Sequence, residues 1–382
     1  MKDISYKGLN INPTELETPS LTNHAEVHDF YWTKNKQFHN ARRLAMIKKY
    51  PEITKLMGPE PLTKYIVLMV VLTQTFIAIA FKNTNFWNWK FLMVAWCIGG
   101  SLNQNCFLAI HELSHNLAFK KPIFNKALSI IAGLPSGVPV SGSFNPYHQL
   151  HHKFLGDEIY DTDVPTKFEA KVLSNFGGKL FFLTFQILFY ALRPGFLTSV
   201  PITLFQVFNV LACICYDLLM TFKWGSFNSF AYLIISSLFA GCFHPTSGHF
   251  IAEHYLFDEA EAIKGGVQAL KFTEPDSVLE DAKKDYLENY RPQYAMETFS
   301  YYGPWNIFVW NAGWHLEHHD FPYIAWTRVN KLHEIAPEFY LGLPHHTSWV
   351  KVLWDFLFTK DVTLYSRVKR VNYEKRAMKK KN

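Results

Sequence analysis

Long apolar segments alternate with strongly polar ones along this chain, a pattern typical of helices that cross a membrane. Residues 64–81 (KYIVLMVVLTQTFIAIAF) and 92–110 (LMVAWCIGGSLNQNCFLAI) are each apolar over about the length that a bilayer requires. The link between them, residues 82–91, carries Trp87 and Trp89, and tryptophan is favoured at the membrane–water boundary. We therefore expect these segments to form a hairpin of two transmembrane helices.

A second hairpin is predicted in the middle of the chain, where residues 196–220 and 227–243 are apolar and separated by a short polar link. Glycines and prolines interrupt residues 127–144, which favours a re-entrant or interfacial passage. Residues 179–195 end in Arg-Pro-Gly and suggest a helix lying in the membrane plane. The predicted fold is an all-α membrane protein with about four transmembrane helices in two hairpins, plus interfacial helices.

The distribution of charge predicts the orientation of the chain. Two hairpins bring both ends to one side, and residues 41–50 and 366–382 at these ends are rich in lysine and arginine. The positive-inside rule places that side in the cytosol, where basic segments contact anionic lipid, and we expect no nucleic-acid partner. No apolar stretch follows Met1, so no signal peptide is expected.

Three regions follow from this pattern. We expect a cytosolic N-terminal arm over 1–62, a membrane domain over 63–345 with a charged insert at about 258–297, and a basic cytosolic tail over 346–382. The chain has five cysteines, all inside apolar stretches and none in a C-x-x-C pair. Neither a disulfide framework nor a thiolate zinc site is therefore indicated.

Histidines form three groups with a regular spacing. On a helix, residues three or four positions apart share one face, so each group can aim its rings at one point. The groups follow the hairpins on the predicted cytosolic side, and we expect them in a helical cap there. They are His111 and His115 in HELSH, His148, His151 and His152 in HQLHH, and His315, His318 and His319 in HLEHH.

Eight imidazoles exceed what one ion can bind, because zinc usually takes four ligands and iron up to six. The count indicates two metals, and imidazole without thiolate suits iron, zinc or copper. Further ligands are possible at His249 and His254, which with His244 are spaced five residues apart and so do not share a helical face. Asn311, one turn before His315, is a candidate for contact with a metal-bound water, with helix capping or packing as the alternative.

Two other classes of protein compete with this interpretation. HELSH satisfies the H-E-x-x-H pattern of zinc proteases, with Glu112 as general base, but the chain has no Leu-Asp-Gly tripeptide for a third ligand. That reading also leaves both H-x-x-H-H groups without a role. A histidine-lined metal transporter needs polar residues inside its spanning helices, and Gln74 and residues 103–105 are few candidates.

Three histidine boxes around two membrane hairpins resemble the membrane-bound fatty-acyl desaturase superfamily. The flanking sequences are similar to those of the sphingolipid delta-4 desaturases, from about residue 29 to residue 373, and the insert at 258–297 departs from many relatives. The segments that carry the resemblance are RRLAMIKKYPEITKLMGPEP (42–61), HELSHNLAF (111–119), GDEIYDTDVPT (156–166), HPTSGHFIAEHY (244–255) and SYYGPWNIFVWNAGWHLEHHDFP (300–322).

The resemblance implies a multi-pass enzyme of the endoplasmic-reticulum membrane that holds two iron ions on the eight box histidines and uses dioxygen. It would convert dihydroceramide to ceramide by forming a trans C4–C5 double bond, with electrons from cytochrome b5 and its NADH-dependent reductase. The chain lacks the His-Pro-Gly-Gly haem loop of a fused cytochrome b5, so a separate donor is expected. A sphingolipid C4-hydroxylase, or another fatty-acyl desaturase or hydroxylase of the superfamily, is the alternative.

Overall fold

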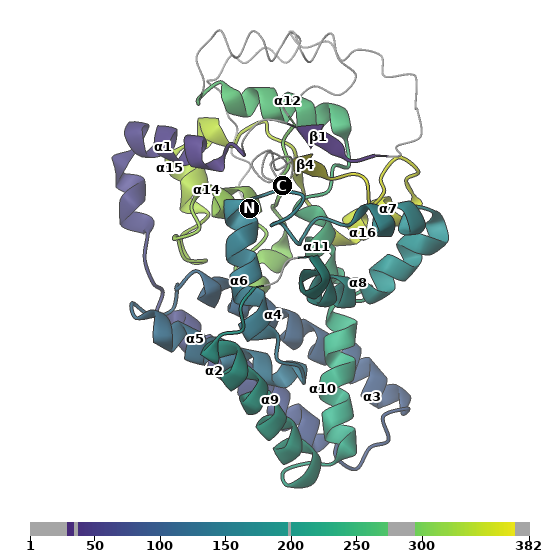
Figure 1. The fold of residues 1–382 in the computed structure, drawn as a ribbon. Helices are drawn as coiled ribbons and strands as arrows, with labels where there is room; N and C mark the ends of the chain where they lie inside the picture. The colour runs from purple at the N-terminus through teal and green to yellow at the C-terminus, as the bar shows by residue number, and fades with distance from the viewer. Residues whose placement is uncertain (1–28, 34–36, 198–199, 274–294, 371–382) are drawn as a thin grey trace, which may run out of the picture.

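The structure is a computed structural model that describes residues 29–33, 37–197, 200–273 and 295–370. It is mostly helical, with a bundle of long helices at one end and a cap of short helices at the other (Figure 1). The helices α6, α8 and α11 lie where bundle and cap meet. Most of the predicted insert and the last twelve residues of the predicted tail, 371–382, lie outside the described residues.

Among the described residues, three helices are long and apolar enough to cross a membrane: α2 (Leu62–Ala80), α8 (Phe176–Leu197) and α9 (Leu204–Phe222). Two bent pairs raise the number to as many as five if each pair is one span. In one, α10 (Phe227–Ala240) continues at 43° into η5 (Pro245–Gly248) and α11 (His249–Ala252). The predicted multi-pass membrane protein is therefore supported at this level.

The other bent pair corresponds to the predicted re-entrant passage. Helix α5 (Pro122–Gly133) with η4 (Leu134–Ser136) meets α6 (Val140–Lys153) at 120°. The reversal takes place at Gly137, whose φ of +68° is a left-handed conformation that glycine adopts without strain. This turn brings α6, with its three histidines, back toward the end of α4.

The predicted span at 92–110 is helical but not uniform. It consists of α3 (Trp89–Val94), the π-helical η3 (Ala95–Gly100) and α4 (Ser101–Ser114). A Cβ at Gly99 would lie 2.1 Å from Ser236 Oγ, so this glycine permits the close approach of α10. The Gly99 carbonyl accepts a hydrogen bond from Gln74 Nε2 at 3.2 Å, which ties α2 to the same point.

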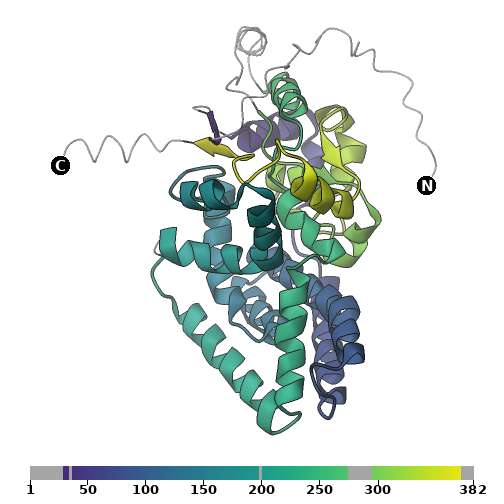
Figure 2. The same ribbon diagram turned by 90° about the vertical axis from the view of Figure 1, so that its right-hand side faces the viewer.

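Helix α8 has a non-helical residue at Phe185, where the helix bends. Figure 2 shows α8 running across the direction of α9 and α10, at the level where the bundle ends. That direction agrees with a helix in the membrane plane, although its length and composition would also allow it to cross.

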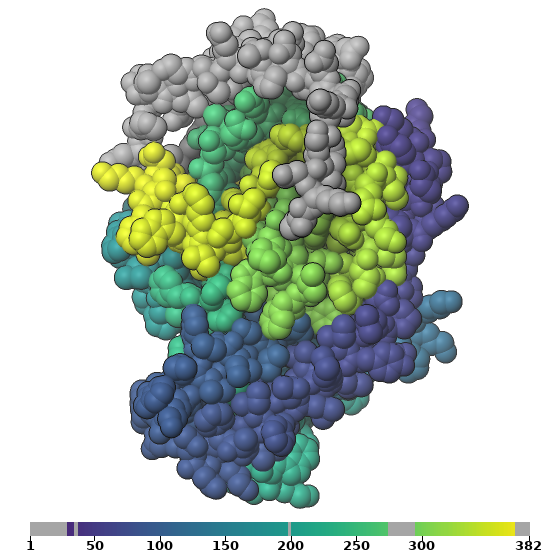
Figure 3. Space-filling view, turned by 180° about the vertical axis from the view of Figure 1, so that it is seen from behind, coloured from purple at the N-terminus to yellow at the C-terminus, as the bar shows by residue number. Residues whose placement is uncertain are grey.

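The cap joins segments from both ends of the chain. Strand β1 (Tyr31–Thr33) pairs in parallel with β4 (Val368–Arg370), and β2 (Ser300–Tyr301) pairs in parallel with β3 (His345–His346). The space-filling view shows the N-terminal segment lying directly against the C-terminal third of the chain (Figure 3). The remaining elements are α1 (His39–Lys49), η2 (Pro51–Leu56), α7 (Lys167–Leu173), α12 (Glu259–Leu270), η6 (Pro304–Val309), α14 (His315–Asp320), α15 (Lys331–Ile335), η7 (Pro337–Phe339) and α16 (Trp349–Phe358).

The described part of the predicted C-terminal tail is packed into the protein. Helix α16 buries Trp349, Val352 and Phe356, and β4 buries Val368. The three side chains of α16 belong to one hydrophobic core cluster, and Val368 belongs to a second.

Candidate metal centre

Three helices bring the predicted histidines to the boundary between bundle and cap. Helix α4 carries one box near its C-terminus, α6 carries the second, and α14 carries the third. In each box the histidines four residues apart lie on one helix face. The middle histidine of an H-x-x-H-H box points away from both, by about 60° from the first and about 100° from the last. This geometry divides the rings into two groups.

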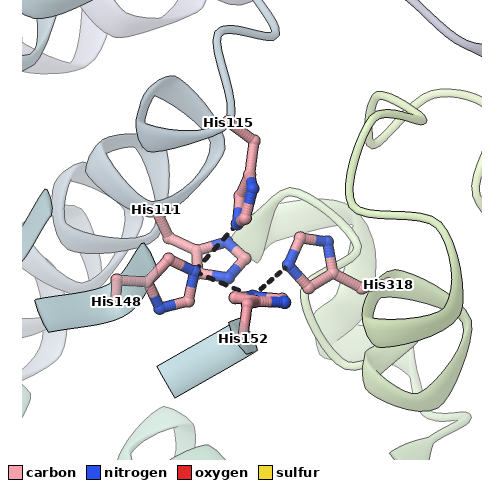
Figure 4. A group of neighbouring side chains, drawn as sticks. All are labelled: His111, His115, His148, His152 and His318. Carbon is pink, nitrogen blue, oxygen red and sulfur yellow. Dashed lines mark hydrogen bonds between the residues drawn. The ribbon is translucent and has the colours of Figure 1, made fainter. Parts of the chain in front are cut away.

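The first group contains five histidines, and the ligand nitrogens lie within 4.8 Å of one another. The Nε2 atoms of His115 and His148 are 2.8 Å apart, and that of His152 is 3.1 Å from His148 and 3.2 Å from His318. His111 Nε2 is buried and has no hydrogen-bond partner within the described part of the chain. Figure 4 shows the five rings, from three separate elements, pointing at one another.

The second group contains His151, His254, His315 and His319, all buried, with ligand nitrogens again within 4.8 Å. His315 Nε2 lies 3.0 Å from His254 Nε2 and 3.1 Å from His319 Nε2. The two groups adjoin, because the stacked rings of His152 and His319 have centroids 4.2 Å apart. The eight box histidines and His254 thus form two neighbouring sets of imidazoles.

The donor chemistry fits metal ions. Both groups consist of histidines alone among the described residues, and burial together with neighbouring imidazoles lowers the pKa of His315, His318 and His319. Neutral rings have one N–H and one lone pair, so clustered Nε2 atoms at 3 Å cannot all satisfy each other with hydrogen bonds. Divalent cations would satisfy these lone pairs, one cation in each group.

Groups behind the rings fix the orientation of two ligands in the second set. His151 Nδ1 lies 2.9 Å from Asp161 Oδ1, and His254 Nδ1 lies 2.8 Å from the Glu297 carbonyl oxygen. Since carboxylate and carbonyl oxygens only accept, both Nδ1 atoms carry the proton and both Nε2 atoms are free to face the centre. Burial alone would raise the pKa of Asp161, but the adjacent His151 ring lowers it.

The structure places His249 and His244 outside both groups. His249 Nδ1 lies 2.8 Å from Gln104 Nε2 and 3.0 Å from the Thr246 carbonyl oxygen, and His244 lies against Ser101 and Thr246. Of the three histidines spaced five apart, His254 alone reaches a ligand group within the described chain.

Asn311 lies beside the first group. Its Nδ2 donates to the Trp326 carbonyl at 2.7 Å, and it lines a small cavity with His111, Glu112 and His318. Glu112 Oε1 accepts from the Trp326 backbone N–H at 2.9 Å. His111 and His115 of HELSH share their group with three further histidines, which differs from the isolated zinc site expected of a protease.

Two protein families match the sequence of this chain. Residues 85–349 match the fatty acid desaturase family, and residues 26–62 match the sphingolipid Delta4-desaturase family. The first match contains all three histidine boxes and His254. The second covers the N-terminal segment that packs against the cap.

Curated relatives align over nearly their whole length. A sphingolipid delta(4)-desaturase of Komagataella phaffii is 53% identical over 342 residues, which cover 90% of this chain and 88% of the relative. Proteins of the same name from Candida albicans and Schizosaccharomyces pombe are 47% and 44% identical, covering 98% and 90% of this chain and 97% and 89% of the relatives.

Proposed function

Because this chain belongs to the fatty acid desaturase family, and within it to the sphingolipid delta(4)-desaturases, we propose that it converts dihydroceramide to ceramide. The reaction introduces a trans double bond between C4 and C5 of the long-chain base. The observation that carries the proposal is the pair of adjacent all-histidine groups at the edge of a membrane bundle, in a chain with relatives of this name.

We assign one iron ion to each group. His111, His115, His148, His152 and His318 would hold the first, and His151, His254, His315 and His319 the second. Five imidazoles exceed the usual four ligands of zinc and suit iron, which takes up to six. When bound, an iron pair supplies the dioxygen chemistry that removes hydrogen from an unactivated methylene, which no side chain can do.

The protein holds the ligand rings in position and excludes water from the site. The ligand rings are buried except for His152, which is partly buried. Hydrogen bonds from Nδ1 of His151 and His254 to fixed oxygens hold these rings in one tautomer and orientation. A buried site at the end of an apolar bundle lets a lipid keep its hydrocarbon tails among apolar side chains while its base reaches the histidines.

The overall balance requires electrons from a partner. The lipid loses two hydrogens, and dioxygen becomes two waters by taking these together with two further electrons and two protons. We propose cytochrome b5 with its NADH-dependent reductase as the donor, and the endoplasmic-reticulum membrane as the location, with the histidine groups and both termini on the cytosolic side. The basic N-terminal and C-terminal segments support this orientation.

Product analysis tests the proposal. Purified protein loaded with Fe(II), in lipid vesicles with cytochrome b5, its reductase and NADH, should convert dihydroceramide to ceramide, measured by mass spectrometry. A His148→Ala variant is the control for metal-dependent turnover. A product that carries a C4 hydroxyl would instead identify a hydroxylase, and zinc at one ion per chain without turnover would refute the proposal.

A further inference from the structure

The N-terminal segment packs against the helix that carries the third histidine box. We propose that His39 and Arg42 of α1 are positioning residues that hold α14, and so the ligand His319, in place through Asp320. This inference rests on the proposed function because it assumes that α14 carries metal ligands. The segment belongs to the 26–62 match and lies outside the fatty acid desaturase match.

Asp320 is the last residue of α14 and directly follows His319. Arg42 Nε lies 3.0 Å from Asp320 Oδ2 and 3.3 Å from Oδ1, and Arg42 Nη2 donates to the Phe339 carbonyl at 2.9 Å. Both charged side chains are fully buried. The guanidinium therefore fixes the end of α14 relative to the rest of the cap, with a fork geometry that a lysine cannot reproduce.

His39 links the same carboxylate to the histidine group. Its Nδ1 lies 2.8 Å from Asp320 Oδ1, its Nε2 lies 3.0 Å from Thr298 Oγ1, and its ring centroid is 5.0 Å from that of His319. Both nitrogens of His39 are thus engaged away from the histidine groups. The His39 ring packs against the imidazole of His319.

Helix α14 needs such support because it has only six residues and no side-chain cap at its N-terminus. Nearer the start of α14, Glu317 accepts from Ser300 Oγ at 2.5 Å and from Tyr302 Oη at 2.7 Å. Glu317 is therefore held by segments of the cap close to it in sequence, whereas Asp320 bonds Tyr340 and, in addition, a segment about 280 residues away. The N-terminal segment therefore holds the C-terminal end of α14.

The same interface contains a second ion pair, which makes a suitable comparison. Arg328 Nη1 lies 3.1 Å from Glu60 Oε2, and its other nitrogens donate to the carbonyls of Leu56 and Gly58. This pair also joins the N-terminal segment to the region after the box, and among the described residues its hydrogen bonds do not reach α14. A role in folding alone predicts that any loss of bound metal follows the loss of melting temperature in the same way for both pairs.

The test compares Arg42→Met with Arg328→Met and with Arg43→Met, a partly buried neighbour whose Nη2 donates to Asn40 Oδ1 in its own helix. Apo-protein in detergent is titrated with Co(II), and bound metal is counted by mass spectrometry alongside the visible spectrum and the melting temperature. We expect Arg42→Met to bind about one cobalt where the parent binds two, with loss of the spectral component of the four-histidine group. Arg43→Met and Arg328→Met should keep two.

A double variant separates positioning from stability. Arg42→Met with Asp320→Leu removes both buried charges, so its melting temperature should return toward that of the parent while the second cobalt stays lost. The inference is overturned if Arg42→Met keeps both cobalt sites, if Arg328→Met at equal melting temperature loses as much metal, or if the double variant regains both. Parent protein that binds two cobalt ions but does not act on dihydroceramide would count against the proposed function only.

Discussion

Replacing Asp161 should separate the stability of the protein from its affinity for metal. Its carboxylate accepts three hydrogen bonds inside the protein, from His151 Nδ1 at 2.9 Å, from the Asp163 backbone N–H at 3.0 Å and from the Gly156 backbone N–H at 2.6 Å. Asp161→Ala leaves three buried donors without a partner. At about 1–3 kcal/mol for each lost partner, and allowing for relaxation, the loss of stability should be about 3–5 kcal/mol.

Asp161→Asn has the same shape but one acceptor oxygen fewer. Asp161 Oδ1 accepts from both His151 Nδ1 and the Asp163 N–H, and Oδ2 accepts from the Gly156 N–H. With the amide oxygen in the place of Oδ2, the NH₂ group takes the place of Oδ1, where it leaves the Asp163 N–H without its acceptor and faces His151. It then requires the His151 tautomer with a proton on Nε2, which cannot bind metal. The loss of stability should then be only about 1–2 kcal/mol, while metal affinity at the four-histidine group falls about 10- to 100-fold.

The assay is a Co(II) titration of the detergent-solubilised apo-protein together with thermal unfolding, where about 1 kcal/mol corresponds to roughly 1–2 °C for a chain of 382 residues. Asp157→Asn is the matched control, because Asp157 Oδ1 accepts from the backbone N–H groups of Ile159 and Tyr160 in the same loop. The reasoning fails if Asp161→Asn binds two cobalt ions with the affinity of the parent, or if Asp157→Asn weakens binding as much.

Three further outcomes are expected. His254→Ala should lose one metal and more than about 100-fold in activity, whereas His249→Ala should keep both metals; equal metal content in the two variants would contradict the assignment of His254. Removing metal with a chelator should lower the melting temperature, because a ligand bound only to the folded state stabilises it, and an unchanged melting curve would argue against structural metal sites. Burial alone would raise the pKa of Glu338, but hydrogen bonds from Lys49 and Tyr50 lower it below its ordinary value. The carboxylate therefore stabilises the protein above about pH 4.3, and this stabilisation is lost as the pH falls through the folded-state pKa. Glu338→Gln should therefore reduce the acid sensitivity of unfolding below about pH 5, and identical pH profiles for the two proteins would show that the pair is without effect.

The helical spacing of the histidines made much of the site predictable. His148 and His152, four residues apart, lie in one group, as do His111 and His115, and the same rule puts His315 and His319 together in the other. The division of each H-x-x-H-H box between two groups was not foreseen. Its signal is present in the sequence, because the position three residues along a helix points about 60° away from its start and 100° from the next residue.

Other parts of the site depend on contacts that no local pattern reveals. His254 was one of three equally spaced candidates. Its ring is oriented by the hydrogen bond from Nδ1 to the carbonyl of Glu297, a residue at the C-terminal end of the charged insert. His39 lies in a polar arm with no histidine spacing around it, and only the packing of α1 on α14 brings it to His319. The glycines and prolines of 127–144 did predict an interrupted passage, which the bend at Gly137 matches, but the apolar pattern gave no sign of the bend within α8.

The pairing of β1 with β4 has a consequence for how the protein is made. Tyr31–Thr33 leaves the ribosome long before Val368–Arg370, so this strand pair can form only after every helix of the bundle and all three histidine boxes have been synthesised. Arg370 then reaches the carboxylate of Glu297, the residue whose carbonyl holds His254. The helices of the bundle are thus synthesised well before the contact that supports the His254 ring can form.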